Sequence, residues 1–104
     1  MIYKISIPDF NDSISLATIG KNLCRIRFRW DEVGEFWEMG IYDPDYVPIF
    51  LGIKMVPNFP LNLFSGHKEF STGYFYVTTN ELRLTRNSFN NGNATLIFGE
   101  REDA

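Results

Sequence analysis

The sequence predicts an all-β fold: a small, mainly antiparallel β-sandwich or barrel of about seven strands, with at most one short helical turn. Aromatic residues are frequent, with ten Phe, five Tyr and two Trp among 104 residues, and aromatic side chains favour strands. Apolar and polar residues alternate in several short runs, which is the pattern of strands with one buried face. No stretch combines a sustained helical period with capping residues. A chain of this length can bury one modest core, so we expect one domain over 1–99 and a charged tail over 100–104.

The stretch from Leu23 to Asp43 predicts the central β-hairpin of this fold. Its first half alternates apolar residues with arginines. In its second half Trp37, Met39 and Ile41 alternate with Phe36, Glu38, Gly40 and Tyr42. If residues 31–34 form the loop, with Gly34 in the left-handed conformation, both strands point their apolar residues to the same side. This register places Phe28 opposite Trp37 and Arg27 opposite Glu38. The expected core of the hairpin consists of Trp30, Trp37, Phe28, Met39 and Ile41.

Shorter alternating runs predict the remaining strands, at 2–7, 13–19, 49–56, 74–79 and 94–98. The second run places Ile14 and Leu16 on one face, and the third places Ile49, Leu51, Ile53 and Met55 on one apolar face. Between the last two strands, residues 85–89 fit a single helical turn with Thr85 as its cap. The connections are short, which favours antiparallel pairing.

Composition argues against several classes of function. The net charge of −3 is unfavourable for a protein that reads nucleic acid sequence, and no stretch is apolar enough to span a bilayer. The start of the chain lacks the basic and apolar pattern of a signal peptide. The one cysteine, Cys24, falls on the apolar face of its strand, where a buried and unreactive thiol is expected.

The sequence offers no convincing catalytic or metal-binding constellation, so we expect neither an enzyme nor a cofactor. His67 stands alone, without a second His or a Cys at the spacing that a zinc site needs. Asp43 and Asp45 flank Pro44, which indicates a turn because the other oxygen ligands of a calcium loop are missing. The carboxylates of residues 32, 35 and 38 fall on the hairpin tip and its polar face, where solvation explains them better than glycoside hydrolysis.

Several strands carry apolar or aromatic residues on both faces, although a domain of this size has one core. Surplus aromatic surface on the second face is typical of contact with other subunits. The face of the hairpin that carries the arginines is the candidate interface: Arg25, Arg27, Arg29, Phe36 and Tyr42.

The hairpin resembles the phage baseplate plug family, including its cyanophage members. The resemblance rests on Trp30, the turn over 31–34, Trp37 seven positions after Trp30, and the run Ile41-Tyr42-Asp43. It extends in order through an apolar strand around Gly52, a proline with a leucine-containing segment, and two later apolar strands. The chain departs from the expected pattern at residues 85–88, where we expect a more acidic turn, and this puts the partner contacts made there in question.

The resemblance implies a non-enzymatic structural protein of the virion, in the tail baseplate, assembled in the cytoplasm of the host bacterium. Its implied role is to dock on hub or tube-proximal subunits and to help build or plug the axial region of the baseplate. The implied partners are hub, tube-initiating or spike proteins within a symmetric assembly. The resemblance supplies no catalytic residues. The alternative is a free-standing carbohydrate- or peptide-binding β module that uses Trp30 and Trp37 as exposed platforms, with readily quenched indoles in a monomer.

Overall fold

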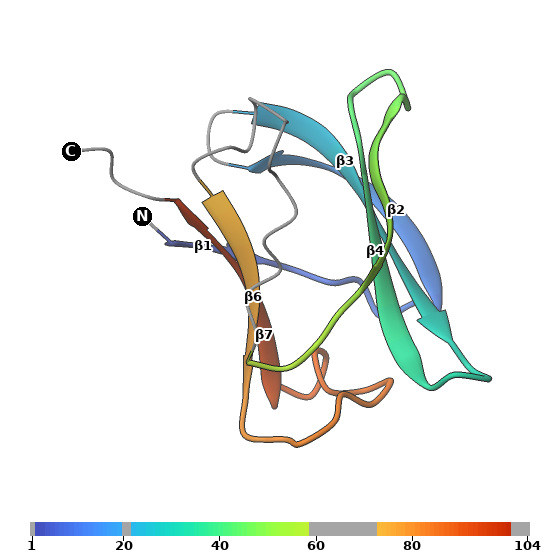
Figure 1. Cartoon of the computed structure of the whole chain (residues 1–104), viewed down its shortest axis with the longest axis vertical. Coiled ribbons are helices and arrows are strands. Elements are labelled where there is room, and N and C mark those ends of the chain that lie inside the picture. The colour runs from blue at the N-terminus through green and yellow to red at the C-terminus, as the bar shows by residue number, and fades with distance from the viewer. Residues whose placement is uncertain (1, 20–21, 59–72, 101–104) are drawn as a thin grey trace.

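The computed structural model describes residues 2–19, 22–58 and 73–100. These residues form seven strands in two antiparallel sheets that face each other as an open sandwich, and they contain no helix (Figure 1). The strands are β1 (Ile2–Ile5), β2 (Asp12–Ile19), β3 (Asn22–Asp31), β4 (Phe36–Tyr42), β5 (Pro48–Lys54), β6 (Gly73–Thr79) and β7 (Ala94–Glu100). The prediction of an all-β, mainly antiparallel fold is therefore confirmed, and of the two predicted forms it is the sandwich and not a closed barrel. Strand β7 includes Glu100, which the sequence analysis had placed in the tail.

The four-stranded sheet has the order β2-β3-β4-β5, and the three-stranded sheet has the order β1-β7-β6. The chain crosses between the sheets from β1 to β2 and again from β5 to β6. Both sheets are open, and their edge strands are β2 and β5 in one and β1 and β6 in the other. The inner faces of both sheets supply the core, as alternation requires. Fully buried side chains of both sheets include Phe28, Trp37, Met39, Ile41, Phe75, Val77 and Leu96.

The central hairpin has the expected faces but a different register. Trp30 lies opposite Trp37 and Phe28 lies opposite Met39, so the pairing is shifted by two residues from the predicted one. A shift of two leaves every side chain on its predicted face, which is why alternation alone could not detect it. The two indoles meet edge to face, with ring centroids 5.6 Å apart. Trp37 is fully buried, and Trp30 is half-buried at the rim of the core.

The hairpin loop explains the shift. The Asp31 carboxylate accepts hydrogen bonds from the backbone N–H groups of Val33 and Gly34, at 3.0 and 2.8 Å, while Asp31 itself stays in the ladder opposite Phe36. The loop therefore begins one residue later than predicted. Its left-handed residue is Glu35, with φ of 55°, and not Gly34. A Cβ atom on Gly34 would lie 2.4 Å from the ring of Phe36, so this glycine is needed for close approach.

The connection between β6 and β7 closes the end of the sandwich nearest the hairpin tip. Residues 85–89 form hydrogen-bonded turns there rather than helix. The carbonyl of Thr85 accepts a hydrogen bond from the indole nitrogen of Trp37 at 3.2 Å, and the ring of Phe89 meets Trp37 edge to face. The guanidinium of Arg86 lies 5.3 Å from the centre of the Trp37 ring. This connection therefore covers the indole that the hairpin buries.

Ser88 is the only buried polar residue of the described chain, and we expect Ser88→Ala to lower the free energy of unfolding by about 1–3 kcal/mol. Its hydroxyl oxygen accepts a hydrogen bond from the Thr85 N–H at 2.8 Å and lies 3.0 Å from the Thr85 hydroxyl. Removal of that oxygen leaves a buried donor unpaired. Urea unfolding followed by circular dichroism measures the loss. Thr95→Ala is a suitable control, and an equal effect of both changes would contradict this account.

Candidate interaction surface

The outer face of the four-stranded sheet, which points away from the core, brings together all five predicted interface residues. Arg25 lies opposite Tyr42 across the β3–β4 ladder, and Arg27 lies opposite Gly40. Because Arg29 follows at the same period, the three arginines form a row along the middle of the sheet. Phe36, the fifth predicted residue, lies at the hairpin end of this face, opposite Asp31. We call this surface the arginine face.

Two of the three arginines are paired with carboxylates on neighbouring strands. The Arg27 guanidinium donates two hydrogen bonds to the Asp12 carboxylate on β2, at 2.8 and 2.5 Å. Arg29 lies 3.5 Å from the Glu38 carboxylate on β4. The predicted Arg27–Glu38 pair is therefore wrong, because the register shift places Arg29 opposite Glu38. These ion pairs are partly exposed and contribute little to stability.

Arg25 differs from the other two arginines. Its Nε donates a hydrogen bond to the Pro44 carbonyl at 2.9 Å, and its guanidinium lies over the Tyr46 ring at 4.2 Å. Within the described part of the chain, no carboxylate forms an ion pair with Arg25. Arg25 consequently retains guanidinium N–H groups that could donate hydrogen bonds to a carboxylate of a partner.

The arginine face also carries apolar side chains that the sequence analysis did not assign to the interface. Ile14 and Leu16 of β2 lie opposite Arg27 and Arg25, so they share the outer face with the arginines. The face of β2 that is turned to the core carries small side chains, those of Ser13, Ser15 and Ala17. Alternation predicted this strand, but it could not say which of its faces is buried. Leu16 is 53% exposed.

On the other side of the row, a β-bulge turns Leu51 outward. The ladder steps by two residues in β4 between Met39 and Ile41 but by three in β5 between Ile53 and Phe50. Gly52 adopts the left-handed conformation there, with φ of 69°. Leu51 is therefore 58% exposed, whereas Ile53 is buried, and the prediction that both share one apolar face is wrong.

The ion pair between Arg27 and Asp12 makes the arginine face sensitive to acid. The hydrogen bond from Arg27 holds the pKa of the Asp12 carboxyl below its usual value. A carboxyl whose pKa is lowered by folding stabilises the protein above its unfolded pKa of about 3.9, and that contribution is lost as the pH falls through the folded pKa. Because both side chains are about half exposed, the contribution is small, about 0.2–1 kcal/mol.

We therefore expect Asp12→Asn to lower the unfolding free energy by about 0.2–1 kcal/mol at pH 7 and by less at pH 2–3. Urea titrations at both pH values measure the difference. Asp45→Asn provides the control, because the Asp45 carboxylate has no ion pair among the described residues. An equal loss at both pH values would contradict a role for the charge of Asp12.

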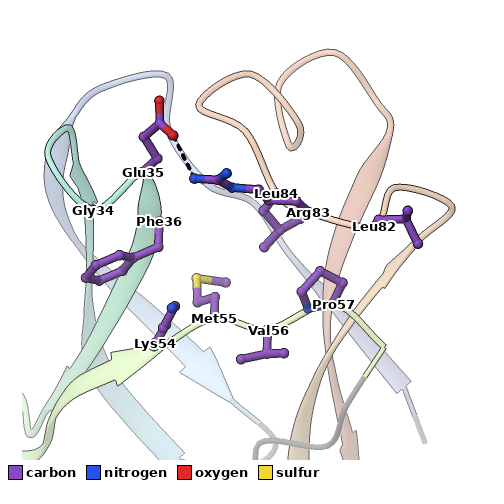
Figure 2. Close-up of a pocket in the computed structure, with 10 residues that line it drawn as sticks. All are labelled: Gly34, Glu35, Phe36, Lys54, Met55, Val56, Pro57, Leu82, Arg83 and Leu84. Carbon is purple, nitrogen blue, oxygen red and sulfur yellow. Dashed lines mark hydrogen bonds and ion pairs between the residues drawn. The ribbon is translucent and has the colours of Figure 1, made fainter.

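A groove lies beside the hairpin tip, and Phe36 is one of the residues that line it (Figure 2). It has a volume of about 400 Å³ and lies between the hairpin loop, the end of β5 and the segment at residues 82–84. The Arg83 guanidinium spans its mouth and lies 2.7 Å from the Glu35 carboxylate. The ammonium of Lys54 lies 5.0 Å from the centre of the Phe36 ring. The charged groups that line this groove thus contact one another or a ring, and among the described residues no catalytic group of side chains converges in it.

The other candidate chemical groups of the sequence have structural surroundings. Burial raises the pKa of the Cys24 thiol to about 11, so this side chain is a neutral thiol at pH 7. The Asp43 carboxylate accepts hydrogen bonds from the N–H groups of Asp45 and Val47, at 2.8 and 2.9 Å, and so builds the turn before β5. His67 lies outside the described residues. Over the described ranges, no three His, Cys, Asp or Glu side chains gather as a metal site would require.

The described residues also contain no helix with the length and apolarity needed to cross a bilayer. A comparison with curated proteins gives no match. A comparison with family models matches residues 2–101 to the model described as cyanophage baseplate Pam3 plug gp18. This match confirms the resemblance seen in the hairpin and covers nearly the whole chain. The chain thus belongs to the baseplate plug family of tailed phages.

Proposed function

We propose that this protein is a structural subunit of a phage tail baseplate that docks through its arginine face on hub or tube-proximal subunits. Membership of a baseplate plug family supports a structural role in the virion tail. Assembly in the host cytoplasm, within a symmetric ring around the tail axis, forms part of the same proposal. We expect no catalytic activity of such a subunit.

One observation carries the assignment of the docking face. Apolar side chains that a free domain would bury surround the arginine row. Ile14 and Leu16 on the β2 side are 43% and 53% exposed, Leu51 on the β5 side is 58% exposed, and Leu23 at the end of the row on β3 is 50% exposed. Apolar surface interrupted by arginine is typical of the contact regions of protein interfaces. Arg25 offers the donors that can fix orientation on an acidic partner.

The competing binding-module hypothesis needs two exposed indoles as platforms. Trp37 is fully buried, and its indole nitrogen donates to a backbone carbonyl. It therefore cannot stack on a sugar or a peptide without unfolding the end of the sandwich. Trp30 alone, half-buried against the core, does not make the paired platform.

Incorporation into particles tests the docking face. A phage lacking this gene is complemented with the wild-type chain, with Arg25→Glu, with Leu51→Asp and with the triple reversal of Arg25, Arg27 and Arg29. The chain in purified virions is then quantified by mass spectrometry. We expect Arg25→Glu and Leu51→Asp each to reduce incorporation at least about tenfold, which corresponds to about 1.4 kcal/mol of binding.

Arg83→Glu is the matched control, because it reverses an exposed arginine that lies by the groove and outside the arginine row. We expect it to enter virions at the wild-type level. Normal incorporation of the triple reversal would refute the docking face. Circular dichroism of each purified variant establishes that it is folded.

A further inference from the structure

A sandwich that is open at its sides has four edge strands, and three of these four edges are blocked by the chain itself. Strand β5 carries two register shifts and begins with Pro48. Strand β1 has only four residues. The edge of β6 is occupied at its end by a parallel bridge between Pro57 and Val77 and by hydrogen bonds that join Asn58 to Val77 and Thr79. Short length, proline, bulges and coverage are the means by which proteins prevent edge-to-edge pairing.

Strand β2 has none of these protections. It pairs with β3 over eight residues without a register shift, and it contains no proline, glycine or lysine. The space beside it is open: a groove of about 370 Å³ lies between the β1 and β2 edges. Among the described residues, β2 therefore offers the one long, regular and accessible strand edge.

The ladder shows which backbone groups of this edge are free. The Trp30 N–H donates to the Asn11 carbonyl at 2.7 Å, so Asn11 and Trp30 form a hydrogen-bonded pair. In an antiparallel ladder such pairs alternate, so the odd-numbered residues of β2 bond to β3. The even-numbered residues Asp12, Ile14, Leu16 and Thr18 direct their N–H and C=O groups outward, away from β3.

We propose that a second copy of this chain pairs with β2 through its own β2, antiparallel and about a two-fold axis, to form a continuous eight-stranded sheet. A copy can offer no other unblocked edge among the described strands. A two-fold axis perpendicular to the sheet keeps the outer faces of both copies on the same side. The inference does not rest on the proposed function, because it concerns the strand edge and not the partner of the arginine face.

The sequence of β2 is complementary to itself in one register, centred on Ser15. In that register Ile14 faces the Leu16 of the second copy, Asp12 faces its Thr18, and Ser15 faces its own equivalent. Apolar residues meet apolar ones on the outer face, and small residues meet small ones on the inner face. The carboxylate meets a hydroxyl, so no like charges lie opposite each other. The four outward-directed residues of each copy would form about eight backbone hydrogen bonds.

Centring on Ile14 or on Leu16 also lets the outward-directed residues pair, but each fits less well. The first places the Asp12 carboxylate opposite the apolar Leu16, and the second leaves Asp12 beyond the paired region, opposite the end of the strand. A disulfide distinguishes these registers. In the register centred on Ser15, the two Ser15 residues form a non-hydrogen-bonded pair with Cα atoms about 4.5 Å apart, within the range that a disulfide spans.

The first test is sedimentation equilibrium of the wild-type chain at 1–200 µM, for which we expect twice the mass of one chain in the upper part of the range. Amide hydrogen exchange needs no variant: the Ile14, Leu16 and Thr18 amides should be protected at high concentration and exchange rapidly on dilution. A monomer throughout, or concentration-independent exchange of these amides, would overturn the proposal.

The second test fixes the register. With oxidised glutathione as the oxidant, which takes up the two electrons and two protons of the thiol pair, Ser15→Cys should give a covalent dimer. The matched control is Ala17→Cys on the same face of the strand, whose equivalents would be about 13 Å apart. Equal cross-linking of both variants would refute this register. The native Cys24 is buried and takes no part.

The third test removes the pairing without removing the strand. Leu16→Pro deletes an outward-directed N–H and leaves the bonds from β2 to β3 intact. We expect at least a tenfold higher dissociation constant of the dimer, with Leu16→Ala as the control for the lost side chain. A dimer unaffected by proline relative to alanine would contradict the proposal. Each of these outcomes is separate from virion incorporation, which tests the arginine face through Arg25 and Leu51.

Discussion

Replacing Trp37 with alanine is expected to lower the free energy of unfolding by about 3–5 kcal/mol. Trp37 is fully buried and lies where the hairpin, the β6–β7 connection and the core meet. Its removal takes away about 150–250 Å² of buried aromatic surface. It also leaves the Thr85 carbonyl without the indole donor and Arg86 without the ring that it covers. The surrounding strands are held by their ladders and can collapse only partly into the cavity.

Urea unfolding followed by circular dichroism measures this loss. Trp30→Ala is the matched control, because it deletes the same side chain from the opposite position of the same hairpin, where the indole is only half-buried. We expect Trp30→Ala to lower the unfolding free energy by roughly half as much or less. An equal or larger effect of Trp30→Ala would show that the hairpin rim, and not the end of the sandwich, holds the core together.

The hairpin illustrates how far the sequence can predict this fold. The alternation of Cys24, Ile26 and Phe28 with arginines determines the faces of β3, because only one face can be buried. Alternation repeats every two residues, however, and so it cannot distinguish registers that differ by two. The side chain of Asp31, which caps the turn, decides between them. That contact depends on three-dimensional geometry and has no counterpart in the apolar pattern.

The candidate surface was predictable only in part, for a related reason. The arginines identify the outer face of β3 by themselves. From their pattern alone, Ile14 and Leu16 would be assigned to the core. The pairing of β2 with β3 instead places them on the outer face, beside Arg27 and Arg25. The alternation places Leu51 in the core, but the bulge at Gly52 turns its side chain to the outer face. A hydrophobic pattern reports which residues share a face, whereas the sheet partners determine whether that face meets the core or the solvent.

Phe75→Ala is the second change for which we expect a large effect, a loss of about 3–5 kcal/mol of unfolding free energy. Phe75 lies on β6, in the sheet opposite both tryptophans, and is fully buried. Its ring contacts that of Phe98 across the ladder, with centroids 5.1 Å apart. The inner faces of the two sheets share one core, so loss of this ring should weaken the contact between the sheets as well as the β6–β7 pair.

This variant also tests the expectation of a single domain over 1–99. If the two sheets unfold together, Phe75→Ala should lower two urea midpoints by the same amount. One is the midpoint measured by tryptophan fluorescence, which reports on the four-stranded sheet. The other is the midpoint measured by far-ultraviolet circular dichroism, which reports on both sheets. Thr78→Ala, an exposed change on the same strand, should alter both midpoints little. A Phe75→Ala chain whose fluorescence midpoint stays at the wild-type value would show that the four-stranded sheet folds without the other one, because the tryptophans would then keep their packing after β6 has lost its own.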